Sequence, residues 1–474
     1  MLVCVGACGG SDDASDPTDA PDPAGLVIAV PGEVYESFVA SATAPEGTAS
    51  VAFFIDAEAE PRCTDLAPPF RCLIHLPPDG PAGDVLVTAR AASAQDASTT
   101  SQRVLPARET CTDSLATCVT SWTTAGTAAG YSGLTYENRD GEHAVVNRDG
   151  MPGLTYVTHN DGSSTWGVTG PSADPAAIVL ANQSQAYTTI GFSLLRYDVI
   201  MQGEFARLEA LYLQSKWRLY PEHTDCGVED MFAFMTPIWL TSQGSSGSEL
   251  DEGRRLLLAL AALPPTVRTT LHAGGALTSA MTAIHRRARV VSDEEYLTGA
   301  AHPTAFGNLD AERATVEAAH ALTADHIPPM AVVAVTADEF AMQDALVTGS
   351  TTVARVFSAG GAEVRRVTLD ASGSRAVNGQ PLTYHWRVLR GDPTLVTITP
   401  TAPDESGVEI TFSRHPSVTY ESLGSSSGTL IPHRSSLVVV GLFVHNGHLF
   451  SAPAFVTSYS DDPRRGAPGG NNLD

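Results

Sequence analysis

Two copies of the tetrapeptide Asn-Arg-Asp-Gly lie nine residues apart in the segment YENRDGEHAVVNRDG, residues 136–150. Asp140 and His143 within it are candidates for metal binding or proton transfer, because carboxylate and imidazole groups do both. The segment lacks the Gly-Gly-x-Gly-x-Asp pattern of calcium-binding repeats, and Tyr136 stands where the first carboxylate of an EF-hand loop belongs. Since Asn, Asp and Gly tolerate positive φ, the simpler interpretation is two turns that bracket a short strand.

A second group of candidate residues closes the stretch KWRLYPEH and continues into TDCGVED. Glu222, His223 and Asp225 lie at the end of a predicted strand, where side chains often face a ligand. They predict a divalent metal site or acid–base catalysis, with His302 from the loop GAAHPTAFGN as a further ligand or catalytic base. No pair has the His-x-x-x-His spacing of a helical metal motif, so a solvated turn is the alternative.

The segment LTSQGSSGSELDEG combines an apolar strand, a Gly/Ser loop and the start of a helix. This is the setting of a serine nucleophile in a Gly-x-Ser-x-Gly turn, which makes Ser246 a candidate nucleophile. Position 248 is serine where that motif has its last glycine. Ser246 or Ser248 could instead cap the helix, with Glu249 or Asp251 as the acid of a capping box. Acids and histidines follow in the order that such hydrolases use, at Asp310, His320, Asp325 and His326.

Aromatic and basic side chains near these groups offer a different chemistry. Trp217 and Tyr220, together with Arg139 and Arg148, could line a glycan site, although aromatic residues on strands are more often half-buried. Lys216 is the single lysine of the chain and is predicted to face solvent, because its neighbours alternate between polar and apolar.

The central region, residues 108–330, must position all of these side chains. It is predicted to fold as a mixed α/β or α+β domain, and it resembles no family that we recognise. A short helix is expected after Ser292, which forms a capping box with Glu295. The longer elements are listed in chain order: strands at 154–159, 176–183, 216–223 and 231–243, and helices at 248–263, from Pro265 to Gly274-Gly275, 276–289 and 310–325.

The preceding region, residues 25–107, alternates short apolar stretches with Pro, Gly and Asp clusters, which predicts a β-sandwich. In SVAFFIDAEAEPRCTDLAPPFRCLIHLPP and GDVLVTARAASAQDAS it resembles a bacterial immunoglobulin-like domain. That resemblance implies a spacer or binding module without catalytic residues.

Strands return in residues 331–460. The segment RRVTLDASGSRAVNGQPLTYHWRVL resembles a PKD-like sandwich, which implies a core position for Trp386. A hairpin is predicted further on, with Asn446-Gly447 as its tight turn, and residues 461–474 are predicted to be disordered. The residues that carry the resemblance are Asp370, Ser372, Gly373, Ser374, Pro381, Leu382, Thr383, Tyr384 and Trp386.

The N-terminus places small residues before Cys8 and then turns acidic and Pro-rich. It resembles a bacterial lipoprotein, which implies that Cys8 is lipidated and that residues 1–24 are a signal remnant and an acidic tether. The chain is therefore expected to be exported and membrane-anchored, in the periplasm or on the cell surface.

The spacing of the other cysteines fits an exported protein. Two pairs are close enough to close small disulfide loops, Cys63 with Cys72 and Cys111 with Cys118, as expected in an oxidising compartment. Cys226 is left over, either buried or as a free thiol.

Composition limits the classes of function. A length of 474 residues predicts about three domains, and 43% hydrophobic with 17% charged residues is typical of a globular chain. A formal charge of −25 argues against nucleic acid as a partner and against direct attraction to an anionic membrane surface.

Two hypotheses follow from these patterns. In the first, the central domain is a hydrolase, metal-assisted or serine-dependent, flanked by sandwiches that space it or hold its substrate. In the second, the chain is a non-catalytic surface binding or adhesion protein. A lipid anchor is the expected link to the membrane in both, and the expected ligand is a glycan, a peptide or another extracellular polymer. A divalent metal is the one cofactor that the residues indicate.

Overall fold

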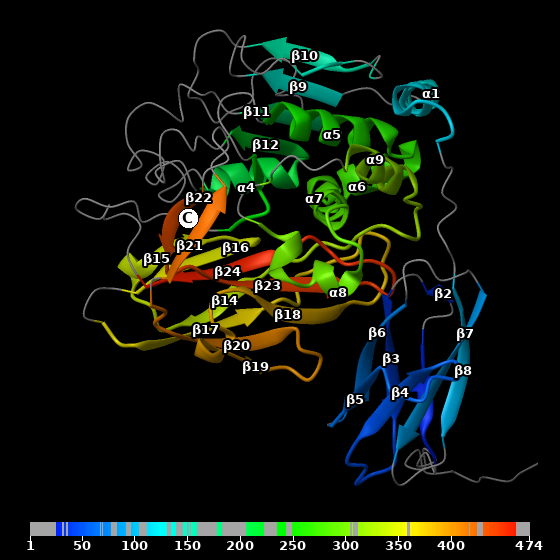
Figure 1. Cartoon of the computed structure of the whole chain (residues 1–474), viewed down its shortest axis with the longest axis vertical. Coiled ribbons are helices and arrows are strands. Elements are labelled where there is room, and N and C mark those ends of the chain that lie inside the picture. The colour runs from blue at the N-terminus through cyan, green and yellow to red at the C-terminus, as the bar shows by residue number, and fades with distance from the viewer. Residues whose placement is uncertain are drawn as a thin grey trace, which may run out of the picture. The chain divides into compact units, whose positions relative to one another are not determined.

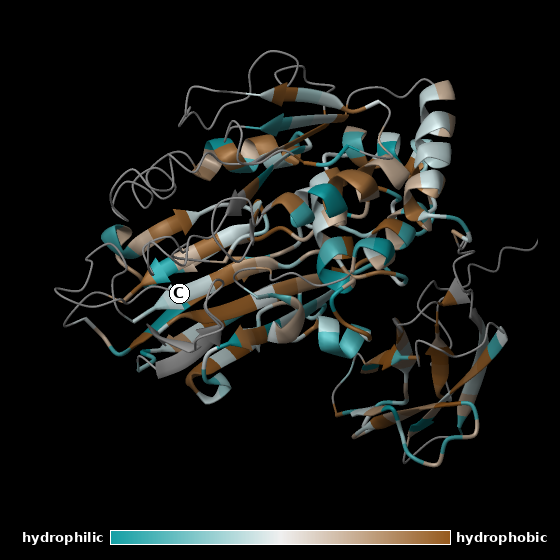
Figure 2. Ribbon diagram, turned by 45° about the horizontal axis from the view of Figure 1, so that its top comes forward, coloured by the Kyte–Doolittle hydropathy of each residue, from teal (hydrophilic) through white to brown (hydrophobic). Residues whose placement is uncertain are grey.

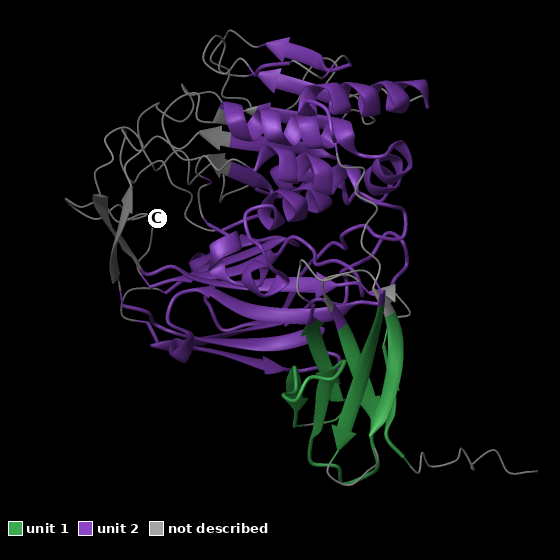
Figure 3. Cartoon of the chain, turned by 45° about the vertical axis from the view of Figure 1, so that its right-hand side comes forward, with its two compact units in different colours: residues 1–32, 39–74, 84–102 green, residues 33–38, 75–83, 103–474 purple. Residues whose placement is uncertain are grey.

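The computed structural model describes most of the chain between residues 25 and 460, and within those residues the chain forms two compact units (Figure 3). Unit 1 comprises residues 1–32, 39–74 and 84–102, and unit 2 comprises residues 33–38, 75–83 and 103–474. The described residues are 25–30, 33–34, 37–66, 68, 70–76, 83–91, 96–103, 111–129, 134–138, 146–148, 151, 153–158, 178–182, 205–221, 235–242, 249–303, 306, 311–357, 361–416, 418–423 and 430–460.

The N-terminal β region consists of two sheets, as its alternating sequence predicts. One sheet has the strand order β1-β3-β6 and the other has the order β2-β8-β7-β4-β5. Buried side chains such as Phe53 and Ile74 come from both sheets, so the region is β-rich and sandwich-like. The strands are β1 Val27–Ala29, β2 Glu33–Val34, β3 Ser37–Thr43, β4 Val51–Ile55, β5 Cys63–Asp65, β6 Phe70–His75, β7 Gly83–Ala91 and β8 Ala97–Arg103.

Unit 2 contains a parallel five-stranded sheet of order β10-β9-β11-β12-β13 (Figure 1). All four strand pairs are parallel, and the inner strands β9, β11 and β12 are buried along their described residues, as in parallel sheets with both faces covered. The central region is therefore α/β, one of the two predicted alternatives. The strands are β9 Leu134–Asn138, β10 Thr155–Thr158, β11 Ile178–Asn182, β12 Lys216–Pro221 and β13 Trp239–Ser242.

The helices of this layer mostly lie where sequence signals place them. Pro265 is the first residue of α6, where its missing N–H costs nothing. Gly275 follows the other end of this helix and has a positive φ of 63°. Ser292 caps α8 by accepting a hydrogen bond from the Glu295 N–H at 3.1 Å, as its capping box predicts. The helices are α1 Leu115–Ala128, α4 Phe205–Leu213, α5 Glu249–Ala262, α6 Pro265–Ala273, α7 Leu277–Arg287, α8 Asp293–Tyr296, the short 3-10 helix Gly299–Ala301 and α9 Glu312–His320.

Helices α1 and α4 and strand β9 were not predicted. The sequence of α1, LATCVTSWTTAGTA, is rich in threonine, which has low helix propensity, and only Val119 and Gly126 in it are buried. It therefore lacks the apolar stripe by which a helix is recognised in sequence. Its position depends on tertiary contacts, including the stacking of Trp122 on His320 with ring centroids 3.7 Å apart.

The C-terminal strands form two further sheets that share one core. The orders are β14-β17-β20-β19 and β15-β16-β24-β23-β18, and Trp386 is buried between them, as predicted. The predicted hairpin joins β23 to β24, and its turn has Gly447 at a φ of 88°. The strands are β14 Ala334–Asp338, β15 Ala345–Thr348, β16 Thr352–Val356, β17 Val364–Asp370, β18 Thr383–Arg390, β19 Val396–Pro400, β20 Gly407–Ser413, β23 Val438–His445 and β24 Ala454–Tyr459, with the separate pair β21 Val418–Leu423 and β22 Leu430–Ser435.

The α/β layer and the C-terminal sheets of unit 2 are joined by burial on both faces of one sheet. On β23, Val438, Val440 and Leu442 belong to the core between the two sheets, whereas Val439 belongs to the core of the α/β layer. Figure 2 shows hydrophobic residues concentrated along these strands. Residue 330, the predicted domain boundary, therefore lies within a single packed unit.

Polar contacts reinforce this junction. Glu209 on α4 accepts hydrogen bonds from the N–H groups of Ser350 and Thr351, in the turn between β15 and β16. Tyr296 donates its hydroxyl hydrogen to the carbonyl oxygen of Ser451 at 2.9 Å. No helix within the described residues is long and apolar enough to span a bilayer.

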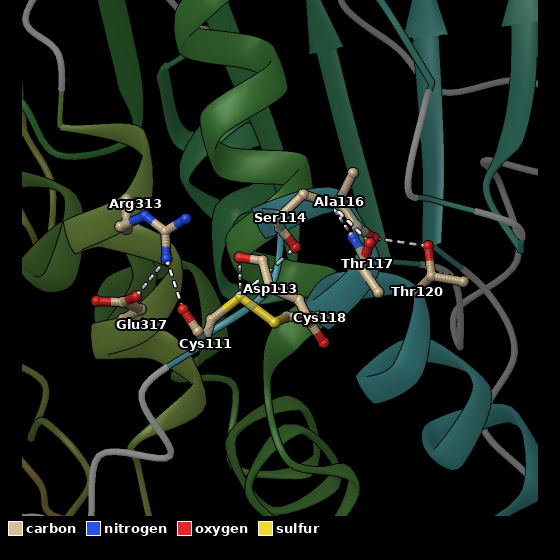
Figure 4. The surroundings of a disulfide bond; sticks show 9 residues. All are labelled: Cys111, Asp113, Ser114, Ala116, Thr117, Cys118, Thr120, Arg313 and Glu317. Carbon is tan, nitrogen blue, oxygen red and sulfur yellow. Dashed lines mark hydrogen bonds and ion pairs between the residues drawn. A yellow bond between two sulfur atoms is a disulfide. The ribbon is translucent and has the colours of Figure 1, made fainter.

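Both predicted disulfides are present, Cys63–Cys72 and Cys111–Cys118, as in proteins of oxidising compartments. The second lies next to α1, which Ser114 caps through the N–H of Thr117 (Figure 4). Arg313 on α9 donates to the carbonyl oxygen of Cys111 at 3.1 Å, so the bridge also links α1 to α9.

Removing the Cys111–Cys118 bridge with a double serine substitution is expected to destabilise unit 2 by about 2 kcal/mol, because the bridge closes a short loop in the unfolded chain. Differential scanning calorimetry and the rate of proteolytic cleavage near α1 measure the effect. The double serine variant at Cys63 and Cys72 is the control and should leave the unit 2 transition in place. An unchanged transition without the Cys111–Cys118 bridge would contradict the expectation.

Candidate functional site

The order of the parallel strands defines the candidate site. The chain forms β9, then β10 on one side of it, and then returns to the other side with β11, β12 and β13. Next to β9 the direction of strand addition therefore reverses, and open α/β sheets bind ligands at the carboxyl ends of strands beside such a switch point. These ends are Asn138 on β9 and Asn182 on β11.

The candidate residues from the sequence lie on segments that continue from these strand ends. Asp140 and His143 follow β9, which ends at Asn138. One to four residues after β12 come Glu222, His223 and Asp225, and Ser246 comes four residues after β13. These six residues lie outside the described residues. So do five others that the sequence singles out: Cys8, Arg139, Cys226, Ser248 and Asp310. The topology thus brings the strand ends together, and the six assignments stay predictions.

Close to this edge, a carboxylate and a guanidinium meet over a small residue. Ala181 on β11 is in register with Glu137 on β9 and with Arg218 on β12, so all three side chains leave the same face of the sheet. The alanine methyl group leaves room for Glu137 Oε2 and Arg218 Nη1 to approach to 3.6 Å above it. Glu137 is completely buried and Arg218 nearly so, which makes this a buried ion pair next to the strand ends.

Polar and aromatic groups also line the end of β9 itself. Asn138 is buried and donates from Nδ2 to the hydroxyl of Tyr156 on β10 at 3.2 Å. Arg148 places its guanidinium carbon 5.0 Å from the centre of the Tyr156 ring, within cation–π range.

A third group lies at the first turn of α5. Glu252 Oε2 accepts from Arg255 at 2.7 Å and lies 3.3 Å from His285 Nε2 on α7. Burial raises the pKa of Glu252, and the nearby Arg255 partly offsets that rise. Burial, followed by the positive charge of Arg255, holds the pKa of His285 well below its usual range, so its imidazole is neutral at neutral pH.

His302, the predicted base, is a buried residue of the core. Its Nε2 lies 2.6 Å from the carbonyl oxygen of Tyr296 and therefore carries the proton, and its ring packs against Phe443 and Phe455. Burial, followed by the charge of Arg286, keeps the pKa of His302 well below the ordinary value. These contacts are those of a structural histidine, and no described nucleophile contacts it.

The downstream histidines, His320 and His326, are also engaged in local contacts. His320 Nδ1 lies 2.8 Å from the carbonyl oxygen of Ala262 at the end of α5. His326 pairs with Thr323 at 3.0 Å and with the ring of His448, whose centroid is 4.4 Å away. Within the described part of the chain no three or more His, Cys, Asp or Glu residues are grouped to hold a metal ion.

The prediction that Lys216 faces solvent is wrong, since the side chain is only 4% exposed. Lys216 begins β12, an inner strand of a parallel sheet with both faces covered, so the alternation of its neighbours does not mark a wet face. Its charge lies near His272 on α6 and, after burial, is the second cause of that histidine's lowered pKa. Trp217 beside it is fully buried, and the side chain of Tyr220 is outside the described residues.

Sequence reasoning did not identify Glu137, Arg218, Glu252 or His285. The alternation in LTYEN and KWRLY reads as one polar and one apolar face, and this pattern hides the fact that the polar face is covered. Glu252 and His285 lie 33 positions apart on different helices, so no local pattern connects them.

Neither a protein-family model nor a curated protein matches the sequence. Among solved structures, a xyloglucanase from Bacteroides ovatus in complex with a heptasaccharide shares 12% identity over 52% of this chain and 63% of that chain, with a TM-score of 0.13. A carbohydrate acetylesterase from Xanthomonas citri shares 10% identity over 91% of this chain and 98% of that chain, with a TM-score of 0.16. These scores are too low to support an argument about fold or function. The class of protein is therefore defined by the chain's own architecture, a parallel α/β layer packed on paired β-sheets.

Proposed function

We propose that this chain is an exported hydrolase whose active site lies at the carboxyl edge of the parallel sheet. One observation supports the proposal most directly. The strand order puts the ends of β9, β12 and β13 at one edge of a single sheet, and the candidate residues follow those three ends in the sequence. In chemical terms the segments supply carboxylates, imidazoles and a hydroxyl group, which are the groups that hydrolysis requires.

Two mechanisms use these residues. In the serine-dependent version, Ser246 is the nucleophile, His143 takes its proton, and Asp140 orients the imidazole. In the metal-assisted version, Glu222, His223 and Asp225 would hold a divalent ion, which would supply a bound water of lowered pKa. The buried Glu137–Arg218 pair links β9 to β12 across β11 beside this edge in either version.

The proposed location is the outside of the cell membrane. Both disulfides agree with an oxidising compartment. The anchor is a lipid on Cys8, and the sheet-rich N-terminal region acts as a spacer or holds substrate, which is a glycan, a peptide or another extracellular polymer.

The second candidate is a non-catalytic binding or adhesion protein. One observation favours it. Four titratable groups that the structure describes beside the site, Glu137, Arg218, Glu252 and His285, are buried and cannot touch a substrate.

The test is active-site labelling of the full-length protein together with metal analysis. A fluorophosphonate probe is expected to modify wild type and Ser245→Ala, the matched control from the same loop, but not Ser246→Ala. In the metal version, stoichiometric metal is expected, and a chelator should lower the free energy of unfolding by about 3 kcal/mol for an ion present at a hundred times its Kd. Glu222→Ala and His223→Ala should abolish that response. If the probe does not label the protein and no metal is bound, the hydrolase proposal is overturned and the binding protein remains.

A further inference from the structure

Basic side chains gather around one phenylalanine ring at the carboxyl end of α7. The guanidinium carbon of Arg286 lies 4.9 Å from the centre of the Phe306 ring, and that of Arg289 lies 4.6 Å from it. The ring of His285 lies 4.8 Å from the same centre. We call Arg286, Arg289, His285 and Phe306 the Phe306 cluster.

Among the residues that the structure describes, positive charge in and beside this cluster exceeds the negative charge that faces it. Two guanidinium groups, those of Arg255 and Arg289, lie near one buried carboxylate, Glu252, whereas no carboxylate among the described residues acts on Arg286. Glu252 is already bonded to Arg255 at 2.7 Å. His285 adds no negative charge, because its burial keeps it neutral.

Arg286 is the least compensated member. Its side chain is 2% exposed, and its Nε and Nη1 atoms have no hydrogen-bond partner in the described structure. Besides Arg289, the titratable groups that act on it are Tyr296, Tyr212, His285 and His302. Burial raises the pKa of both tyrosines and lowers that of both histidines, so none of the four carries a negative charge at neutral pH. Burial lowers the pKa of Arg286 to about 10, and the group therefore stays protonated at neutral pH.

Aromatic contacts do not replace a counter-charge here. Phe306 and Phe455 lie 4.9 and 5.5 Å from the Arg286 guanidinium carbon, and such contacts contribute about 1 to 2 kcal/mol when desolvated. Removing a cation from water costs several kcal/mol, and buried charges in proteins are accordingly paired with opposite charge. The unpartnered N–H groups of Arg286 and Arg289 Nη1 point to a missing anion.

We propose that the Phe306 cluster binds a small inorganic anion of chloride size, held by the N–H groups of Arg286 and Arg289. The size follows from the burial of Arg286, which leaves little room for a larger ion. Arg289 is only half-buried and connects the cluster to solvent, so it provides the path of entry. His285 Nε2 faces Glu252 at 3.3 Å, so Nδ1, which has no hydrogen bond, is the ring nitrogen of His285 left to contact the anion.

The test compares the full-length protein in sodium bromide and in sodium gluconate at equal ionic strength. Bromide should raise the Tm saturably, by about 3 °C or more at a hundred times its Kd. Arg286→Met should remove this dependence, and Arg289→Gln should weaken it at least tenfold in apparent Kd. Arg287→Gln is the matched control, because Arg287 is adjacent but pairs with Asp293 at 3.1 Å. It should keep the wild-type response.

Anomalous diffraction from a bromide-soaked crystal locates the ion. A peak beside Arg286 that Arg289→Gln weakens supports the proposal. Equal Tm values in the two salts would overturn it, as would a bromide response that the Arg289→Gln protein retains in full. If Arg286→Met does not fold, the Arg289→Gln protein decides the question. If water alone hydrates the cluster, the Tm values in bromide and gluconate will be equal.

Discussion

Acid is expected to unfold this protein well before its carboxylates are titrated. Burial holds the pKa of His445 near 3, and it holds those of His285, His302 and His385 well below their usual range. Each is neutral in the folded state and becomes protonated in the unfolded chain below about pH 6.5. The unfolded state therefore binds more protons, and stability that is present above pH 6.5 is lost as the pH falls.

The expected size of this effect is large. At pH 5, one fully buried neutral histidine lowers the free energy of unfolding by about 2 kcal/mol relative to pH 8. Four such residues approach the total stability of an ordinary domain, about 5 to 15 kcal/mol. Urea unfolding of the full-length protein at pH 8, 6 and 5 measures the loss.

A variant at His302 separates this effect from general acid sensitivity. His302→Gln keeps a donor for the carbonyl oxygen of Tyr296 but does not titrate. Its free energy of unfolding should depend less on pH than that of wild type, by about 1.4 kcal/mol per pH unit between pH 6 and 5. An identical pH dependence in the two proteins would refute the assignment. Retained activity in this variant would also show that His302 is not the catalytic base.

Removing Glu137 is expected to have the second large effect. Glu137→Ala leaves Arg218 buried without the carboxylate 3.6 Å away, and breaking a buried pair in this way costs about 3 to 5 kcal/mol. Chemical denaturation at pH 7.5 is the measurement. The loss should appear as a lower midpoint with an unchanged slope, because the size of the folded core stays the same.

The matched control is the double variant Glu137→Ala with Arg218→Met. It removes both charges, so it should recover most of the lost stability, since apolar replacement of a whole buried pair is often neutral. If Glu137→Ala lowers the free energy of unfolding by less than about 1 kcal/mol, Glu137 does not compensate the buried charge of Arg218. The folded double variant also shows whether the charges serve the proposed activity apart from their effect on stability.

Local signals in the sequence were sufficient for much of the secondary structure. Pro265 starts a helix and Gly274-Gly275 ends it, Ser292 caps the next short helix, and Asn446-Gly447 turns a hairpin. Each of these depends on the φ angle or hydrogen bond of a single residue or of a few neighbours, so sequence alone expresses it. The two disulfides were predictable for the same reason, because their partners are only nine and seven residues apart.

Tertiary structure alone decided which groups meet. Strand order is a long-range property, and the pairing of β9 with both β10 and β11 creates the switch point beside which the candidate residues continue. The meeting of Glu137 and Arg218 depends on the register of Ala181 between them, and that of Glu252 and His285 on the packing of α5 against α7. The burial of Lys216 likewise follows from the layers that cover both faces of the sheet. The periodicity of a sequence reports the shape of one element, whereas burial and contact depend on its neighbours, which lie far away along the chain.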